Sequence, residues 1–413
     1  MRRLALLLSI GAGYGAGCSG DPCEGIEGTC VGLHAGASAT VVQTALIEIS
    51  PGGTVAFGEG TFSFETDLSL DVDDVTIVGA GMDKTTLSFR HQTEGAQGLL
   101  VTAKAGFTLR DIAIEDTPGD GVKVLGCDGV HFDHVRAEWT DGPKETNGSY
   151  GLYPVQCKNV LIEGCTVRGA SDAGIYVGQS DNILLRDNRA ENNVAGIEIE
   201  NSTHADVTKN TATGNTGGIL VFNLPGLEVK NGAITRVFDN EVLANNTVNF
   251  APAGNIVAMV PTGTGIAILA AHQIEVFANT IKDHKSINIG IISYVPLGIA
   301  VTDPTYDQYP TAIDIHDNTL TGTSDMPTGL LGGLLISALG EIYPNGPFVV
   351  PDVAWDGVLD PARTYGPDDK LCVKNNGDAD FINLAWPLAD ATTPSIDMTP
   401  HDCSHVPLPQ VSL

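Results

Sequence analysis

The hexapeptide ILLRDN, residues 183–188, recurs in altered form along the chain, and the spacing of its copies decides the fold. VLIEGC begins 23 residues earlier at position 160, and ADVTKN begins 22 residues later at position 205. The remaining copies are FTLRDI at 107, VHFDHV at 130, TRVFDN at 235, IEVFAN at 274 and IDIHDN at 313. A base period of 22 or 23 residues with occasional longer intervals is typical of a solenoid.

Each copy alternates in the manner of a β-strand. Its first and third positions are apolar while the second and fourth vary, and no copy contains a helix-length periodic stretch. Three short strands per period, with Gly, Asn and Asp at the corners, make one coil of a parallel β-helix. The sequence therefore predicts an all-β chain folded as a single parallel β-helix of about nine to eleven coils. The last position of several copies predicts a stacked ladder of amides, formed by Asn188, Asn210, Asn240, Asn279 and Asn318.

Two parts of the chain resemble known families. VVQTALIEISPGGTVAFGEGTF (residues 41–62) and VTIVGAGMDKTTLSF (75–89) are similar to the N-terminal cap and first coils of the pectin-lyase-like right-handed β-helix superfamily. Residues 145–300, with YGLYP, DAGIYVGQS, GIEIENS and GGILVFNLPG, resemble a bacterial family of exported parallel β-helix repeat proteins, many of them lipoproteins. The resemblance covers roughly residues 40–380 and implies a right-handed solenoid, with a short capping helix near residues 39–49. It brings no catalytic signature and only a hint of carbohydrate.

The N-terminus has the pattern of an export signal. MRRLALLLSIGAGYGAGC places two arginines before an apolar run and small residues before a cysteine. We expect a lipoprotein signal peptide at residues 1–17, lipidation of Cys18, and a cell-envelope location, at the outer membrane or in the periplasm. A linker would follow at 18–37, the β-helix at 38–340 and an irregular C-terminal cap at 341–413. The protein would be a monomer that meets the membrane only through its lipid anchor.

The chain is strongly acidic, with a formal net charge of -29. Such a charge repels nucleic acid and anionic lipid, so we expect no nucleic-acid partner. It also opposes a polyanionic substrate unless local cations or a bound metal reverse the field. The acidity is explained equally well as a source of solubility.

The cysteines are expected to be oxidised in an exported protein. Cys127 and Cys157 each stand six residues after a repeated glycine, so the register stacks them on adjacent coils about 4.8 Å apart, within reach of a disulfide. Cys165 takes the place of a ladder asparagine and is expected to be buried and free. The other predicted bridges are Cys23–Cys30 and Cys372–Cys403.

The stretch NVAGIEIENS, residues 193–202, places two glutamates where the neighbouring coils carry other residues. Counting two residues past each repeated glycine gives one outward column, which consists of Lys123, Tyr153, Tyr176, Glu198 and Leu220. Counting four past gives the next column, which consists of Leu125, Val155, Gly178, Glu200 and Phe222. Gly178 is expected to leave a notch beside Tyr176, and Asp172 stands at the entrance of the same strand. A row of amides follows at Gln156, Gln179, Asn201 and Asn223.

This strip of aromatic, amide and carboxyl groups suits a sugar chain lying along the solenoid axis, because four coils span about 15 Å. We expect residues 137–150 and the insertion after Phe222 to wall it. The predicted catalytic residues are Tyr176, Glu198, Asp172, Tyr153 and Lys123. The predicted substrate-binding residues are Glu200, Gln179, Asn201, Gln156 and Asn223.

Three functions remain open for the strip. The leading hypothesis is lyase or C5-epimerase chemistry on an acidic polysaccharide, in which Lys123 neutralises the sugar carboxylate, Tyr153 or Tyr176 exchanges the proton, and Glu198 positions the substrate or acts as base. A glycoside hydrolase would instead use a carboxyl pair from Asp172, Glu198 and Glu200. A non-catalytic surface protein that binds polysaccharide or protein is the rival, and the scarcity of cations in the strip favours it.

No metal site is predicted from the sequence. The chain has no CxxC pair, no HExxH and no phosphate-binding loop, and its ten histidines are dispersed. Acidic oxygen ligands are abundant enough for a Ca²⁺ ion, but no loop has a recognisable calcium-binding spacing. An outward ion pair is expected between Glu163 and Arg186.

Overall fold

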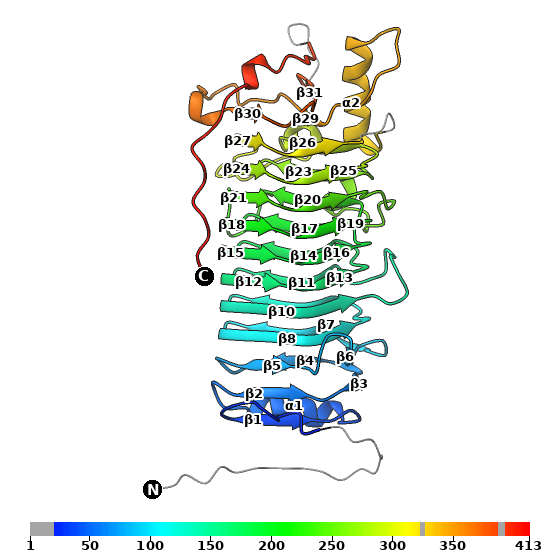
Figure 1. Cartoon of the computed structure of the whole chain (residues 1–413), viewed down its shortest axis with the longest axis vertical. Helices are drawn as coiled ribbons and strands as arrows, with labels where there is room; N and C mark the ends of the chain where they lie inside the picture. The colour runs from blue at the N-terminus through cyan, green and yellow to red at the C-terminus, as the bar shows by residue number, and fades with distance from the viewer. Residues whose placement is uncertain (1–19, 323–326, 387–392) are drawn as a thin grey trace.

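The protein is a parallel β-helix in this computed structural model, which describes residues 20–322, 327–386 and 393–413. Figure 1 shows the coils stacked in sequence order, from the blue N-terminal coils to the yellow coils near the other end. Cys18 and the predicted signal peptide lie outside the described residues. The fold class is as predicted, and its coils form two long sheets whose strands pair in parallel.

The eleven-strand sheet forms one side of the solenoid. Its strands, in order along the stack, are β4 (Thr66–Leu70), β7 (Glu94–Thr102), β9 (Asp120–Leu125), β11 (Tyr150–Val155), β14 (Ala173–Gly178), β17 (Ala195–Glu200), β20 (Gly217–Phe222), β23 (Thr264–Leu269), β26 (Ile287–Ile292), β29 (Val353–Trp355) and β31 (Phe381–Asn383).

The twenty-strand sheet supplies the rest of each coil. Its first series is β1 (Cys30–Leu33), β2 (Thr54–Phe57), β5 (Thr76–Val78), β8 (Ala105–Glu115), β10 (Asp128–Glu138), β12 (Lys158–Glu163), β15 (Asp181–Arg186), β18 (Thr203–Thr208), β21 (Ala233–Phe238), β24 (His272–Phe277), β27 (Thr311–His316) and β30 (Leu371–Lys374). Its second series is β3 (Gly60–Ser63), β6 (Thr85–Ser88), β13 (Thr166–Arg168), β16 (Arg189–Glu191), β19 (Thr211–Thr213), β22 (Glu241–Leu243), β25 (Thr280–Lys282) and β28 (Thr319–Thr321).

Strand alternation builds the interior of the solenoid. In β15 the side chains of Ile183 and Leu185 are buried, while Leu184 between them lies on the outer side and is half-buried. Equivalent residues of successive coils join one continuous apolar core. Burying such side chains stabilises a fold by about 1.5–3 kcal/mol each, so the repeated apolar positions are sufficient to drive coil stacking.

Two asparagine ladders run along the stack inside the solenoid. The predicted ladder is present: Asn188 donates through Nδ2 to Oδ1 of Asn210 at 2.9 Å, and the pattern continues through the later members to Asn376. The chain immediately before each of these asparagines turns through positive φ, as at Asp187 and Lys209. Five residues further on, a second ladder that sequence reasoning missed consists of Asn193, Asn215, Asn245 and His284.

The solenoid extends past both predicted boundaries. The capping helix α1 (Ala39–Glu48) is where it was expected, begun by the Ser38 hydroxyl accepting from the Val41 N–H. However, β1 lies inside the predicted linker, and β29, β30 and β31 continue both sheets inside the predicted C-terminal cap. These boundaries were wrong because the terminal coils do not keep the hexapeptide pattern.

The other helices are α2 (Gly329–Ile342) and the short 3-10 turns η1 (Ile256–Met259), η2 (Val295–Leu297), η3 (Pro367–Asp369) and η4 (Thr399–His401). Within the described part of the chain, no helix has the length and apolarity needed to cross a membrane.

The cysteines correct one prediction. Disulfides join Cys23 to Cys30 and Cys372 to Cys403, at two of the predicted pairs, and Cys165 is buried and free. Cys127 and Cys157 lie on adjacent coils as the register requires, but both are free buried thiols, so the predicted bridge between them is wrong. The Cys157 sulfur accepts from the Cys127 backbone N–H at 3.4 Å instead. The strand register places the two cysteines on adjacent coils, but it does not determine whether a disulfide forms.

Candidate functional site

The eleven-strand sheet aligns the predicted site residues in the expected columns. Lys123 pairs with Tyr153, Tyr176 with Glu198, and Glu198 with Leu220. In the adjacent column Gly178 pairs with Glu200. Period-2 alternation puts both columns on the outer side of the sheet, which is why the sequence located them correctly.

The strip is covered, and the insertion after Phe222, which was expected to wall it, is part of the cover. Every residue of β14, β17, β20 and β23 is buried, although only one face of these strands points into the solenoid core. Three covering segments, residues 224–232, 246–262 and 293–310, pack on the other face and form a second apolar cluster there. Members of that cluster are Tyr176, Leu220, Phe222, Val257, Val260, Tyr294, Leu297 and Tyr306.

Tyr176 fills the predicted notch. A Cβ atom built on Gly178 would lie 2.3 Å from the Tyr176 hydroxyl, so the absent side chain is the space into which the ring folds. From there the Tyr176 hydroxyl donates to Oε1 of Glu200 at 2.6 Å. Burial raises the pKa of Glu200 to about 7, against the lowering effect of this hydrogen bond.

Asp172 meets the glutamates from the turn before β14. Asn255, on the second covering segment, donates to Asp172 Oδ2 at 2.9 Å, and Tyr150 also hydrogen-bonds to this carboxyl group. Burial, reinforced by the charge of Glu200, raises the pKa of Asp172 to about 7. Glu198 is the deepest of the three carboxyl groups, 1% exposed, and its Oε2 has no hydrogen-bond partner among the described residues.

We call Asp172, Glu198 and Glu200 the carboxyl cluster. Burial, together with Asp172 and Glu200, raises the pKa of Glu198 well above its ordinary value. Among the described residues, no cation contributes to the pKa shifts of the three groups. Carboxyl groups so placed retain protons at neutral pH and can serve as acids as well as bases.

Aromatic rings border the cluster on the side of the N-terminal coils. The ring centroids of Tyr150 and Tyr153 are 4.4 Å apart, and those of Tyr150 and Tyr176 are 4.5 Å apart. Lys123 Nζ lies 4.9 Å from the centroid of Tyr153. Next to it, burial raises the pKa of Asp120 to about 6 while Lys123 opposes that shift. Four of these side chains are half-buried, namely Asp120, Lys123, Tyr150 and Tyr153, so this border is the most accessible part of the site.

The amide row holds the covering segments. Gln179 Oε1 accepts from the backbone N–H groups of Glu228 and Val229 at 3.0 and 3.2 Å. Asn201 donates to the carbonyl groups of residues 224 and 229, Asn223 donates to those of 232 and 270, and Gln156 donates to the Glu228 carboxylate at 2.9 Å. The structure uses these amides to attach the cover to the solenoid, and their role in substrate binding stays a prediction.

Sequence reasoning missed Tyr150, Asp120 and Asn255. Tyr150 and Asp120 each stand one residue before a repeated glycine, in register with Ala173 and Ala195, whose small side chains leave room for rings. Counting that offset would have found both residues. Asn255 lies in an insertion outside the repeat, so no period could have placed it over Asp172.

One group of described side chains elsewhere has metal-like spacing. The ligand atoms of His131, Asp133 and Glu163 lie within 4.8 Å of one another. However, Arg186 donates to Glu163 Oε2 at 2.8 Å, and His131 Nε2 lies 2.9 Å from Glu163 Oε1. The expected Glu163–Arg186 ion pair is therefore confirmed, and the group is explained as a surface network of opposite charges.

The chain belongs to the family described as right-handed beta helix region. That family matches residues 97–249 and 150–303, which together span half of the chain. The match confirms the right-handed parallel β-helix. A comparison with curated proteins gives no match.

Several solved structures are similar in fold. The mannuronan C-5 epimerase AlgE4 A-module of Azotobacter vinelandii is 17% identical, over 66% of this chain and 80% of that one, with a TM-score of 0.43. Tailspike protein 2 of bacteriophage CBA120, as its enzymatically active domain, is 9% identical, over 80% of this chain and 46% of that one, with a TM-score of 0.51. Endopolygalacturonase I from Stereum purpureum is 14% identical, over 72% and 89%, with a TM-score of 0.43. At these identities the likeness concerns the fold.

Proposed function

We propose that the protein is a carbohydrate-active enzyme that acts on a polysaccharide by general acid–base catalysis at the carboxyl cluster. The observation that carries this proposal is the burial of Asp172, Glu198 and Glu200 side by side, with the pKa values of Asp172 and Glu200 at about 7. A catalytic acid or base works best when its pKa is close to the working pH.

Structural roles do not account for this burial. Moving a carboxyl group out of water without a compensating cation is costly, and leaving Glu198 Oε2 without a partner adds to the cost. A fold gains nothing from buried carboxyl groups that raise one another's pKa, whereas an acid–base site uses them. This reasoning favours catalysis over the alternative of a non-catalytic surface protein.

Glycoside hydrolysis fits the cluster best. It uses two carboxyl groups, one protonated and one ionised, on the two sides of a glycosidic bond. Asp172 and Glu200 titrate in the same range, so at neutral pH the pair holds a shared proton. The protonated member gives its proton to the leaving glycosidic oxygen, and the ionised member activates the attacking water. Glu198, protonated beneath them, keeps the local charge low.

Lyase or C5-epimerase chemistry is the second candidate, and Lys123 favours it. Its ammonium group lies against the Tyr153 ring at the accessible border, where it can neutralise a uronate carboxylate while the phenol exchanges the adjacent proton. Burial raises the pKa of Tyr153 to about 12, so little phenolate is present at neutral pH to accept the proton, and we rank this chemistry second.

The covering segments determine how a substrate enters. Asn255 and Tyr306 join two of them to the floor of the site, through Asp172 and the Asn223 carbonyl respectively. We infer that a glycan first binds at the half-buried Tyr150, Tyr153 and Lys123. The net charge of -29 opposes a polyuronate and favours a neutral or weakly charged glycan.

Export and lipid anchoring belong to the same proposal. An extracytoplasmic location agrees with the two disulfides, because such bonds persist in oxidising compartments. The test is Cys18→Ser: the altered protein should leave membrane fractions, and retention there would contradict lipidation.

The catalytic proposal is tested with a panel of neutral glycans and uronates, with and without Ca²⁺. New reducing ends would report hydrolysis, an ultraviolet-absorbing unsaturated product would report a lyase, and NMR of the sugar protons would report epimerisation. Glu200→Gln should lower the rate on any active glycan by about 10²–10⁴-fold. The matched control is Glu163→Gln, which removes a half-buried carboxylate from the other sheet and should keep the rate. Equal rates in wild type and Glu200→Gln would overturn the proposed site.

A further inference from the structure

The last ten residues, 404–413, form a C-terminal tail on the outside of the twenty-strand sheet. Figure 1 shows it in red, running from the β30 end of the stack down the side of the coils to the level of β12. It contains no helix or strand. Near its end, Asn182 on β15 donates to the carbonyl oxygen of Ser412 at 3.1 Å. The tail therefore crosses several coils that are distant from it in sequence.

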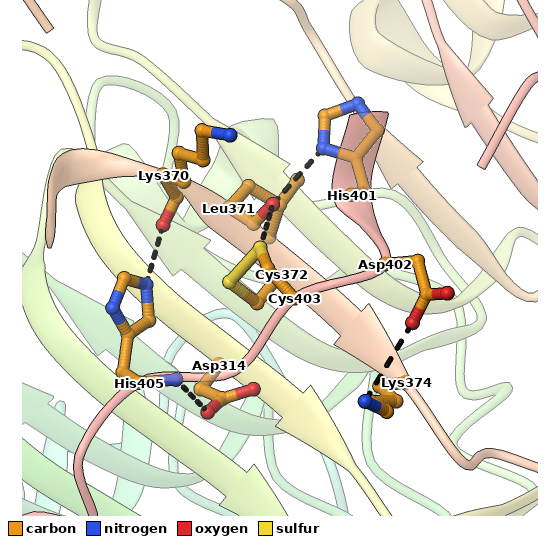
Figure 2. Close-up of a disulfide and its surroundings, with 9 residues drawn as sticks. All are labelled: Asp314, Lys370, Leu371, Cys372, Lys374, His401, Asp402, Cys403 and His405. Carbon is orange, nitrogen blue, oxygen red and sulfur yellow. Dashed lines mark hydrogen bonds and ion pairs between the residues drawn. A yellow bond between two sulfur atoms is a disulfide. The ribbon is translucent and has the colours of Figure 1, made fainter. Parts of the chain in front are cut away.

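A disulfide fixes the root of the tail. Figure 2 shows Cys403 bonded to Cys372 on β30. Beside the bridge, His401 Nδ1 lies 3.0 Å from the Leu371 carbonyl oxygen, and His405 Nε2 lies 2.8 Å from that of Lys370. These contacts end at His405, so the remaining residues are held by the sheet alone.

The tail contacts the sheet with every third residue. His405, Leu408 and Val411 are half-buried, whereas the residues between them are exposed, with Val406 86% exposed. The backbone N–H groups of the three half-buried residues donate to Asp314, Glu275 and Asp206, at 2.8, 3.1 and 3.2 Å. A three-residue period in a segment with two prolines is typical of the polyproline II conformation.

The receiving residues form one column across successive coils. Asp206 pairs in register with Arg236, Arg236 with Glu275, and Glu275 with Asp314, and we call these four residues the charged row. Arg236 lies 3.2 Å from Asp206 and 3.7 Å from Glu275. The three carboxylates are buried beneath the tail, and Oδ1 of both Asp206 and Asp314 has no hydrogen-bond partner among the described residues. The carboxylates of the charged row can therefore accept more hydrogen bonds than the tail donates to them.

The tail lies on the row without sealing it. A cavity of about 350 Å³ remains between them, lined by Glu275, Asp314, Asp368, His405 and Leu408 among others. Most tail side chains point away from the sheet, so the contact consists mainly of backbone N–H groups on carboxylates. A segment held this way is separable from the solenoid core, unlike the strands.

We propose that the charged row is a docking groove for an extended peptide in the polyproline II conformation. Its occupant here is the chain's own tail, and the same segment of a second copy fits it equally well. The groove recognises backbone N–H donors three residues apart, and side chains between them remain free to vary. At ordinary protein concentrations the chain's own tail occupies the groove in preference to the tail of a second copy, because its attachment at Cys403 gives it a high effective concentration. This site is independent of the proposed acid–base site on the eleven-strand sheet.

The test uses the full-length protein with Leu408→Pro and Val411→Pro. Each change removes one backbone N–H donor, so the variant's own tail should leave the row while the row itself is unaltered. A fluorescent peptide of residues 404–413 with the natural sequence should then bind the variant with saturation, and bind wild type at least about tenfold more weakly because its own tail competes.

Two peptides check the proposed recognition. A peptide with Leu408→Pro should bind the variant about tenfold more weakly or worse, because it lacks the donor to Glu275. A peptide with Val406→Pro is the matched control: it also gains a proline, but the N–H that it loses has no partner among the described residues, so its affinity should be unchanged. Equal binding of both peptides overturns the proposal, as does absence of binding to a variant with native circular dichroism.

A second measurement covers the case in which the double variant does not fold. In wild type, amide hydrogen exchange at Leu408 and Val411 should be slow, and Glu275→Gln should accelerate it at Leu408 with little change at Val406. Unprotected amides in wild type would overturn the docking geometry. Displacement of the peptide by an oligosaccharide, without any dependence on Leu408, would overturn the peptide as ligand.

Discussion

Two sets of buried carboxyl groups lie outside the solenoid core, one on each sheet. The carboxyl cluster on the eleven-strand sheet has tyrosines and an asparagine as its partners. The carboxylates of the charged row on the twenty-strand sheet have Arg236, His316 and the N–H groups of the tail. Similar burial is thus combined with opposite electrostatic surroundings.

This difference fits the two roles proposed for the regions, in which the charged row binds the tail and the carboxyl cluster carries out acid–base chemistry. In the row, Arg236, His316 and the N–H donors act against the desolvation of the carboxylates, although burial still raises the pKa of Asp206 and Asp314. In the cluster the neutral partners leave that cost in place, and the groups respond by holding protons, with the pKa values of Asp172 and Glu200 at about 7. The cluster thus differs from the row in having no cation against its carboxyl groups, and this difference is what the proposed acid–base site rests on.

The largest expected effect contrasts Glu275 with Glu198. Glu275→Gln removes the charge that faces Arg236 and His316 and should lower the free energy of unfolding at neutral pH by about 3 kcal/mol. Glu198→Gln replaces a carboxyl group whose pKa burial raises well above its ordinary value, and it should change that free energy by less than about 1 kcal/mol. Urea unfolding of both variants is the measurement. Equal losses would contradict the division between the two regions.

Stability should fall as the pH rises through the range in which the cluster ionises. The pKa of Asp172 rises from 3.8 to about 7 on folding and that of Glu200 from 4.5 to about 7, so the folded state holds more protons between these limits. The stabilising effect is complete below about pH 4 and is lost toward pH 7 and above. With about 1.4 kcal/mol per pKa unit, wild type should be at least about 2 kcal/mol less stable at pH 8 than at pH 5. Thermal or urea unfolding across this range should show a smaller slope for Glu200→Gln, and an unchanged slope would contradict the assignment.

Gly178→Ala should disturb the cluster without touching a carboxyl group. The new Cβ would lie 2.3 Å from the Tyr176 hydroxyl, so the ring must turn away and lose its bond to Glu200. We expect a loss of about 1–2 kcal/mol of stability and, because that bond lowers the Glu200 pKa, an upward shift of the pH limit of activity. A pH–rate profile tests the shift. Tyr176→Phe should reproduce the shift with less strain, and opposite shifts in the two variants would contradict the mechanism.

The smallest expected effect concerns the cover. Gln179→Ala removes the acceptor of the Glu228 and Val229 N–H groups and should cost about 1 kcal/mol or less. Amide exchange at these two residues should nevertheless become faster, because the first covering segment is released locally. Exchange in the charged row is the internal control. Unchanged protection at Glu228 would show that the amide row does not attach the cover.

The repeat made the fold and the columns predictable. Strand alternation and the 22-residue period are local properties of the sequence, so they placed Tyr176, Glu198 and Glu200 in register and stacked Asn188 on Asn210. The second ladder was equally visible, five residues after the first. Counting at that offset would have predicted it.

The insertion after Phe222 was expected to wall the site, but the cover formed by residues 246–262 and 293–310 was not predictable from the same pattern. The segments that bury it are insertions between coils, and no period states on which face an insertion lies. For the same reason the sequence did not show that Gln179 and Asn201 hydrogen-bond to backbone groups of inserted residues. The predicted Cys127–Cys157 bridge was wrong for a different reason. Strand register brings the two thiols onto adjacent coils but does not decide whether a disulfide forms.

The start of the first ladder divides the solenoid into two kinds of interior. Cys165 occupies the first rung, and its backbone N–H donates to Asn188 Oδ1 at 2.9 Å. Before that rung the interior is filled by ring pairs, such as Phe64 with Phe89 and Phe107 with Phe132, and after it amides bond from coil to coil. Rings give each early coil a large share of nondirectional stabilisation, whereas each amide rung depends on the next. We therefore expect unfolding of the later coils to proceed in steps along the stack and to stop at the coils that contain the ring pairs.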